Sequence, residues 1–302
     1  MQEVTPAAVR LGVLGWPVAH SRSPAMHNAA FAAAGLTGWR YQRLPVPPQL
    51  LGETVRGLPA VGFLGANVTI PHKAAALALA DTATEAAREI GAANTLSFVE
   101  DGAIEADNTD GPGLVDLLGA DVRGRRALVL GAGGSARAAV WALMRAGAAD
   151  VAIWNRTAER AGELASAFGA RAVKAPEPAD VLVNCTSVGL VEAEPPVPEN
   201  PDSDAGSLGD PDIRLERSAT QGCALNHLGL TFDQVGGYAH VIDLVYRPGA
   251  TPLLAAARAH DARTLDGLSI LVAQGALSFE RWTGLPAPRG EMERAARSAQ
   301  SD

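Results

Sequence analysis

The sequence is poor in features that identify several classes of protein. Only two of its 302 residues are cysteines, Cys185 and Cys223, and they form no Cys-x-x-Cys pair. The histidines His20, His27 and His72 show no i, i+4 metal spacing either. These absences exclude a disulfide framework and a cysteine metal site, so we expect no metal. So few cysteines also suit a reducing compartment, and we expect a cytoplasmic protein.

Basic clusters and long apolar runs are missing as well. The formal net charge is -8, and no block of lysine and arginine would attract nucleic acid or an anionic membrane. No stretch reaches the roughly 18 apolar residues of a membrane-spanning helix, and the beginning of the chain lacks the parts of a signal peptide. We therefore expect neither a nucleic-acid nor a membrane partner, and any anionic substrate must be held by local groups.

The residues that are abundant favour helices packed on parallel strands. Hydrophobic residues make up 47% of the chain and aromatic residues only 5%. A chain of 302 residues exceeds the usual span of one core, so two α/β domains are expected. The first is an N-terminal open α/β substrate domain of residues 1–110, completed by C-terminal helices from residues 267–302 that pack back on it. The second, residues 111–266, is a Rossmann-like, doubly wound nucleotide-binding domain.

Alternation of β-rich and helical runs gives the expected elements. Strands are predicted at 11–14, 39–44, 65–70, 94–99, 103–106, 127–130, 151–154, 181–184 and 241–245. Helices are predicted at 24–34, 49–57, 73–80, 114–118, 135–146, 158–168, 268–281 and 291–297. The segment 191–237 is rich in Glu, Pro, Asp, Ser and Gly, and we expect it to be irregular.

A glycine-rich turn joins the strand at 127–130 to the helix that follows. It reads Gly131-Ala132-Gly133-Gly134-Ser135-Ala136. The first glycine permits the turn, the second lets a pyrophosphate approach the backbone, and the small alanine allows close packing of helix and strand. The helix N-terminus then faces the phosphates. A tight βα turn that binds no ligand is the alternative.

The end of the next strand indicates which dinucleotide binds. An NAD-binding fold places Asp or Glu there, whereas this chain has Asn155, Arg156 and Thr157, with Arg160 one helical turn later. Two guanidinium groups can hold a 2′-phosphate, which an acidic side chain would repel. The sequence therefore favours NADP over NAD. The alternative is that both arginines are solvated surface residues without a ligand. Their position at the carboxyl end of the strand disfavours this alternative.

Lys73 lies in the first turn of the predicted helix at 73–80, after a strand and Pro71. Cations are disfavoured at the positive end of a helix, so this lysine gains nothing locally. Reduction of a carbonyl needs a proton donor beside the oxygen, and a lysine can serve as one. Asp110, in the turn between the domains, is the candidate that orients it. Spacing alone does not decide this pairing, because most Lys and Asp side chains are simply solvated.

Ser21 and Ser23 lie where the first strand gives way to a helix that begins near Pro24. Hydroxyl and backbone N–H groups converge at such a point and can hold a small carboxylate. Ordinary N-capping of the helix is the alternative.

Taken together, these segments resemble the shikimate dehydrogenase family from about residue 11 to residue 284. The matching motifs, in the family's order, are 15–24 (GWPVAHSRSP), 67–73 (NVTIPHK), 91–95 (GAANT), 107–111 (DNTDG), 131–134 (GAGG), 155–157 (NRT), 184–189 (NCTSVG), 243–248 (DLVYRP) and 272–276 (VAQGA). Two departures are Ile270, where many members have methionine, and a longer stretch between Gly189 and Asp243.

The resemblance implies reversible reduction of 3-dehydroshikimate to shikimate by NADPH, with Lys73 and Asp110 as the proton-transfer pair. It implies that Ser21 and Ser23 bind the substrate carboxylate. It also implies that the ring hydroxyls and their surroundings are contacted by Thr69, Asn94, Gln274 and Tyr246. On the cofactor side it implies contacts from the glycine-rich turn, Asn155, Arg156, Thr157, Arg160, Thr186 and Leu244.

Two other functions remain open at this point. One is a quinate/shikimate dehydrogenase of broader specificity, perhaps with NAD, and the other is a regulator that binds shikimate or NADP without catalysis. The arginine pair argues against NAD, and Lys73 with Asp110 and Gln274 argues against a regulator. The sequence leaves the oligomeric state open, with a homodimer among the states it allows.

Overall fold

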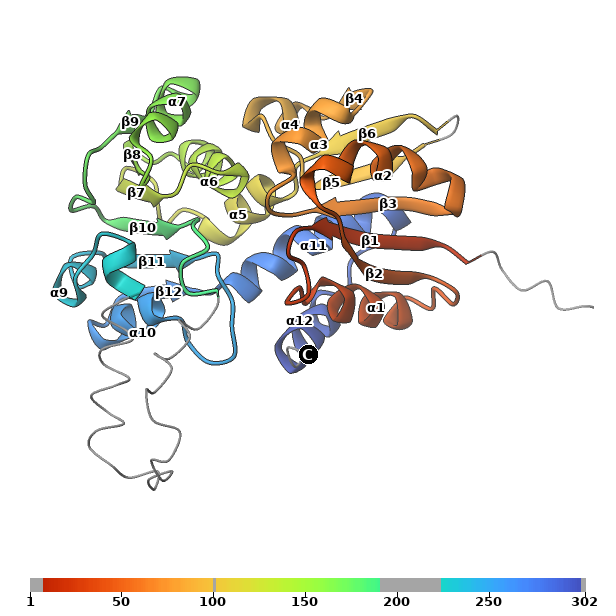
Figure 1. The fold of residues 1–302 in the computed structure, drawn as a ribbon. Coiled ribbons are helices and arrows are strands. Elements are labelled where there is room, and N and C mark those ends of the chain that lie inside the picture. Colours follow the sequence, from red (N-terminus) through yellow and green to blue (C-terminus); the bar gives the residue numbers. More distant parts are fainter. Residues whose placement is uncertain (1–7, 100–101, 191–223, 300–302) are drawn as a thin grey trace, which may run out of the picture.

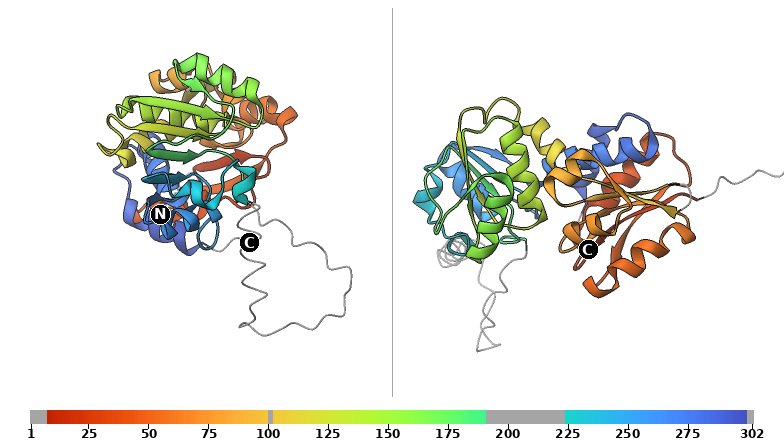
Figure 2. Two further views of the ribbon diagram at one scale, coloured as in Figure 1. Left: turned by 90° about the vertical axis from the view of Figure 1, so that its left-hand side faces the viewer. Right: turned by 90° about the horizontal axis from the view of Figure 1, so that it is seen from above.

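Two six-stranded sheets organise the chain. The structure is a computed structural model, and it describes residues 8–99, 102–190 and 224–299. We call the part built on the first sheet the first lobe and the part built on the second sheet the second lobe. Figure 1 shows the lobes beside one another, with helix α5 (Asp110–Leu118) between them. The view from above in Figure 2 shows the same separation.

The first sheet is mostly parallel and has the order β2-β1-β3-β5-β6-β4. Only β5 runs antiparallel to its neighbours, and it forms a hairpin with β6. The strands are β1 (Arg10–Gly15), β2 (Arg40–Pro45), β3 (Phe63–Val68), β4 (Thr82–Ala83), β5 (Thr95–Phe98) and β6 (Ile104–Asp107). Part of the hairpin turn, residues 100 and 101, lies outside the described residues.

Helices cover both faces of the first sheet, because side chains of successive strand residues point to opposite faces. Leu11 and Val13 pack against α1, whereas Leu14 packs with α2 and α3 on the other side. The helices of this lobe are α1 (Ser23–Ala33), η1 (Pro48–Leu50), α2 (Leu51–Gly57), η2 (Pro59–Val61), α3 (Lys73–Leu79) and α4 (Glu85–Ile90).

The second sheet is entirely parallel and has the order β12-β11-β10-β7-β8-β9. Numbered within the sheet, this is the 3-2-1-4-5-6 order of dinucleotide-binding folds, with the reversal between β7 and β10. The strands are β7 (Arg126–Leu130), β8 (Asp150–Trp154), β9 (Arg171–Ala172), β10 (Val181–Asn184), β11 (His240–Asp243) and β12 (Arg263–Leu265). Helices α6 (Gly134–Arg145), α7 (Ala158–Phe168), α9 (Phe232–Val235) and α10 (Pro252–Ala259) flank it. The doubly wound architecture is confirmed.

The C-terminal helices return to the first lobe, as expected. Helix α11 (Gly267–Thr283) packs against α5, and α12 (Arg289–Ser298) packs against α1. Contact with α5 is close at Gly113, where a Cβ atom would lie 2.9 Å from the backbone nitrogen of Gln274. The described chain therefore passes from the first lobe to the second at α5 and returns to the first lobe just before α11. The two crossings lie side by side.

The structure corrects several local predictions. Helix α3 begins at Lys73 as predicted, but it ends at Leu79 and not at residue 80. Strand β11 ends at Asp243 and not at residue 245. The short elements β4, α4, β9, α10 and β12 were not predicted. Of the segment expected to be irregular, residues 191–223 lie outside the described part, and residues 232–235 form α9.

Two absences can be stated for the described part of the chain. No helix within residues 8–99, 102–190 and 224–299 combines the length and apolar character that a membrane crossing requires. Within those same ranges, no three His, Cys, Asp or Glu side chains gather as they would around a metal ion.

Candidate active site

The carboxyl ends of both sheets meet at a cavity of about 160 Å³ between the lobes. The predicted substrate and proton-transfer residues all line it: Ser21, Ser23, Thr69, Lys73, Asn94, Asp110, Tyr246 and Gln274. From the second lobe, Ser135, Thr186 and Leu244 also line it. A larger cavity of about 750 Å³ lies behind Tyr246, next to α10 and α12, but it contains neither Lys73 nor Asp110. The smaller cavity is therefore the candidate active site.

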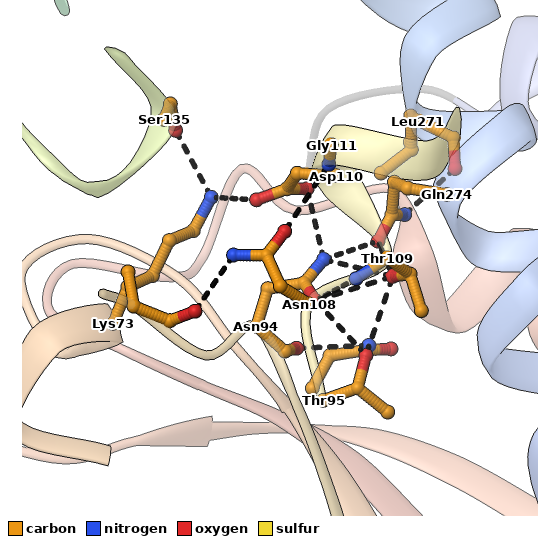
Figure 3. Close-up of polar contacts among 12 residues, drawn as sticks. Lys73, Asn94, Thr95, Asn108, Thr109, Asp110, Gly111, Ser135, Leu271 and Gln274 are labelled. Atoms are coloured by element: carbon orange, nitrogen blue, oxygen red, sulfur yellow. Dashed lines mark hydrogen bonds and ion pairs between the residues drawn. The ribbon is translucent and has the colours of Figure 1, made fainter. Parts of the chain in front are cut away.

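Lys73 and Asp110 form an ion pair on the wall of this cavity. Lys73 Nζ lies 2.6 Å from Asp110 Oδ2, and the two side chains are only 11% and 15% exposed. Lys73 Nζ also donates to Ser135 Oγ, at 2.9 Å. Figure 3 shows the ammonium group between the carboxylate and the hydroxyl. A partly buried pair of this kind can hold and transfer a proton without mixing freely with bulk water.

The other oxygen of Asp110 is held from below by Asn94. Asn94 Nδ2 lies 2.8 Å from Asp110 Oδ1, 2.9 Å from Thr109 Oγ1 and 3.1 Å from Gln274 Oε1 (Figure 3). Gln274 reaches this point from α11, far along the sequence. The amide of Asn94 thus fixes the orientation of the carboxylate that pairs with Lys73, and it joins three segments of the chain.

A second layer of polar side chains, which sequence reasoning did not identify, lies under this one. Asn67 Nδ2 donates to Thr95 Oγ1 and to Ser278 Oγ, each at 3.0 Å. Tyr41 donates its hydroxyl to Asn67 Oδ1 at 2.6 Å. All four side chains are buried, and each finds a partner, as buried polar groups must. Asn67 opens one of the family motifs, which is the signal that could have pointed to this layer.

Ser21 and Ser23 also lie on the wall of this cavity. Both are buried, at 5% exposure each, and α1 begins at Ser23 itself. Neither hydroxyl caps the helix in the ordinary way, because the N-cap residue is Arg22 and it makes no side-chain cap. Tyr246 lines the same cavity, and burial raises the pKa of Tyr246, although Arg22 and Ser21 act in the opposite direction. Uncharged donors therefore line this part of the cavity.

The glycine-rich turn has the shape that a dinucleotide pyrophosphate requires. Gly131 has a φ of +110°, and a Cβ atom there would lie 3.2 Å from the backbone of Cys185. Gly133 precedes α6, and a Cβ atom there would meet no heavy atom within 4 Å. Gly131 is thus required by the fold, whereas Gly133 opens onto free space. The first N–H groups of α6 face that space, so the turn fits a bound pyrophosphate.

The arginines expected at the adenosine end are both exposed. Arg156 lies in the loop after β8, and α7 begins at Ala158, so only Arg160 is on the helix. The expectation that Arg160 follows Arg156 by one helical turn is therefore wrong in detail, because Arg156 precedes the helix. Asn155 Nδ2 donates to the carbonyl of Thr157 at 2.9 Å and holds the loop in its turn. Two cations at this edge fit a 2′-phosphate and would not favour a ribose diol.

A buried polar network that the sequence analysis did not single out lies at the carboxyl ends of β10 and β11. Asn184 Nδ2 donates to Asp243 Oδ1 at 2.9 Å, and Thr251 Oγ1 donates to Asp243 Oδ2 at 2.6 Å. Burial raises the pKa of Asp243 to about 6, although these hydrogen bonds act in the opposite direction. Asn184 Oδ1 in turn accepts from the Thr186 hydroxyl at 2.8 Å. The network fixes the loops in which Thr186 and Leu244 face the cavity.

Comparison with known protein families matches three parts of the chain. Residues 13–96 match the shikimate dehydrogenase substrate binding domain, residues 114–188 match the shikimate / quinate 5-dehydrogenase model, and residues 267–297 match the shikimate 5′-dehydrogenase C-terminal domain.

Individual relatives and solved structures extend the similarity to nearly the whole chain. The NADP(+) shikimate dehydrogenase of Paracoccus denitrificans is 41% identical, over 90% of this chain and 90% of that protein. The shikimate 5-dehydrogenase of Thermus thermophilus, solved in complex with NADP(H) and shikimate, is 39% identical, with a TM-score of 0.76 over 97% of this chain and 100% of that chain. The Aquifex aeolicus shikimate dehydrogenase is 33% identical, with a TM-score of 0.79 over 98% and 100% of the two chains.

Proposed function

The chain belongs to the shikimate dehydrogenase family, and we propose from this premise that the cavity between its lobes is where the family's reaction takes place. The protein is an NADP-dependent oxidoreductase that reversibly reduces 3-dehydroshikimate to shikimate, a step of aromatic amino acid biosynthesis. The observation that carries the assignment of the site is the Lys73–Asp110 pair, at 2.6 Å, in the cavity where the two lobes meet.

NADPH, when bound, supplies the hydride for the ring carbonyl. Lys73 donates a proton to the carbonyl oxygen during reduction and recovers it from the shikimate hydroxyl during oxidation. Asp110 accepts from Lys73 and keeps the ammonium group directed into the cavity. Asn94 holds the carboxylate through its second oxygen, so the pair does not need to reorganise when the proton moves.

Two groups of side chains on the cavity wall hold the substrate. Ser21 and Ser23, supported by Tyr246, bind the carboxylate through neutral hydroxyl donors. Thr69, Asn94 and Gln274 bind the ring hydroxyls next to Lys73 and Asp110. Burial of these donors makes a substrate that lacks a matching oxygen costly to bind, because it would leave them unpaired.

The carboxyl edge of the second sheet would hold NADP. The glycine-rich turn would receive its pyrophosphate through the backbone of Gly131, Ala132, Gly133, Gly134, Ser135 and Ala136. Arg156 and Arg160, with Asn155 and Thr157, would hold the 2′-phosphate. Thr186 and Leu244 would contact the nicotinamide end. The exposed guanidinium groups favour NADP, since each can donate two hydrogen bonds to a phosphate.

A comparison of initial rates tests the assignment. Shikimate and quinate are each oxidised with NADP and with NAD, by the wild type, by Lys73→Ala and by Lys174→Ala, in which an exposed lysine is removed as the control. We expect shikimate with NADP to dominate, and Lys73→Ala to lower kcat by about 100-fold or more. Near-normal turnover by Lys73→Ala would refute the proton-transfer role. Equal rates with quinate would support the broader enzyme, and binding of shikimate without turnover would support a regulator.

We also propose the domain division at residues 110 and 266, with residues 267–302 completing the first domain, a cytoplasmic location and a homodimer. Support for the location is the chain's biosynthetic reaction together with its two cysteines. Sedimentation of the purified protein tests the dimer directly, because a monomer has a mass of 31.1 kDa.

A further inference from the structure

We propose that Ser135 is a positioning residue that couples occupancy of the dinucleotide site to the placement of Lys73. The proposal rests on the role given above to Lys73 and goes beyond the expected backbone contact of Ser135 with the cofactor. Its basis is the side chain: the Ser135 hydroxyl is part of the second lobe, yet it accepts a hydrogen bond from the lysine of the first lobe.

The contact is built by the tight approach of two helix starts. Lys73 is the first residue of α3, and Ser135 is the second residue of α6. At the neighbouring Gly134, a Cβ atom would lie only 2.8 Å from Lys73 Cβ and 3.1 Å from its Cδ. The stem of the lysine therefore lies directly against the glycine-rich turn, and this approach depends on the absence of a side chain at Gly134.

Two acceptors, one from each lobe, determine the direction of the ammonium group. A lysine ammonium has three hydrogens. One is directed at Asp110 Oδ2 and one at Ser135 Oγ (Figure 3), which leaves the third for an oxygen of a bound substrate. With Asp110 alone, the ammonium could rotate about that single contact. Ser135 removes this freedom and so aims the third N–H.

The same residue would face a bound cofactor through its backbone, because it lies in the first turn of α6. The first N–H groups of a helix have no partner within it, and in this fold they point at the pyrophosphate. A dinucleotide bound at the start of α6 therefore fixes the residue whose hydroxyl holds Lys73. Binding of cofactor then favours the orientation of Lys73 that binds shikimate. By linkage, shikimate must favour cofactor binding to the same extent.

The test measures that coupling directly. Shikimate does not react with NADPH, so its dissociation constant can be determined by calorimetry with and without saturating NADPH. We expect NADPH to tighten shikimate binding in the wild type and in Ser135→Thr, which keeps the hydroxyl. In Ser135→Ala the tightening should disappear, and kcat/KM for shikimate should fall about tenfold, mainly through kcat, because a hydrogen bond to a charged group is lost. Ser166→Ala, on the exposed side of α7, is the control.

Two results overturn the proposal. The first is wild-type coupling and wild-type kcat in Ser135→Ala. The second is an equal loss in Ser135→Ala and Ser135→Thr, which would mean that the hydroxyl is not responsible. Either result is distinct from failure of the proposed catalytic role, which would appear as turnover in Lys73→Ala.

Discussion

His27 should make the first lobe sensitive to acid. Its side chain is fully buried on α1, stacked on the ring of Tyr41 with centroids 4.4 Å apart and close to Trp282. Among the described residues, neither ring nitrogen has a hydrogen-bond partner. Burial lowers the pKa of His27 to about 3, from 6.5. The imidazole therefore stays neutral in the folded protein at pH values where it is protonated in the unfolded chain.

The sign and size of the effect follow from this difference. A depressed pKa in the folded state contributes stability that is present above the unfolded pKa and is lost as the pH falls toward the folded one. At pH 5 the unfolded chain binds a proton at this position and the folded chain does not. Between pH 7 and pH 5, His27 alone should therefore lower the free energy of unfolding by about 2 kcal/mol.

Urea unfolding of His27→Phe and of the wild type, each at pH 7 and pH 5, measures this term. Phenylalanine keeps an aromatic ring next to Tyr41 and cannot be protonated. Any change in packing is the same at both pH values and cancels, so the wild type should lose about 2 kcal/mol more than the variant. His227→Phe, at an exposed position, should behave as the wild type. Equal pH dependence in His27→Phe and the wild type would refute the reasoning.

Three further predictions concern the second lobe. The raised pKa of Asp243, about 6, means that the wild type loses stability as the pH rises through this value. Asp243→Asn cannot titrate, so between pH 4 and pH 7 its free energy of unfolding should rise by about 2 kcal/mol relative to that of the wild type. Urea unfolding at both pH values measures this change, and a constant difference between the two proteins would contradict it. Arg156→Ala should raise the Michaelis constant for NADP about tenfold or more with little change for NAD, since it loses a charge-assisted phosphate contact; equal effects on both cofactors in steady-state assays would count against it. Gly133→Ala should raise the Michaelis constant for NADP about tenfold while the melting temperature stays nearly constant, because its Cβ meets only open space until a pyrophosphate binds; a large fall in Tm would show a structural glycine instead.

Much of the fold could be predicted because strong local signals carried it. The apolar strand before Gly131 has alternate residues on two buried faces, with Leu128 and Leu130 on one and Val129 on the other. A central parallel strand of this kind appears in the sequence as a continuous apolar run. The short elements β4, β9 and β12 have two or three residues each and give no comparable pattern.

The site was predictable as a set of residues but not as an arrangement. Lys73 was noticed because a cation is misplaced at a helix start, and the structure brings it to Asp110. Its second contact, Ser135, depends on how the two lobes approach one another, which no local pattern records. The same holds for Asn67 and Ser278, which meet although they lie on β3 and α11. Contacts of this kind are set by tertiary packing, so spacing along the chain does not reveal them.

The two adjacent crossings between the lobes determine how the lobes can move. Because α5 and the start of the α11 segment lie against one another, with Gly113 in close contact with Gln274, the chain provides a single pivot. Relative motion of the lobes about such a pivot is a rotation, because sliding of one lobe along the other would break the contact between Gly113 and Gln274. Gln274 lies both at the pivot and on the cavity wall. A substrate that binds Gln274 therefore lies next to the rotation axis, where rotation of the lobes displaces it least. The edge of the second lobe that binds the dinucleotide lies away from this axis and moves furthest.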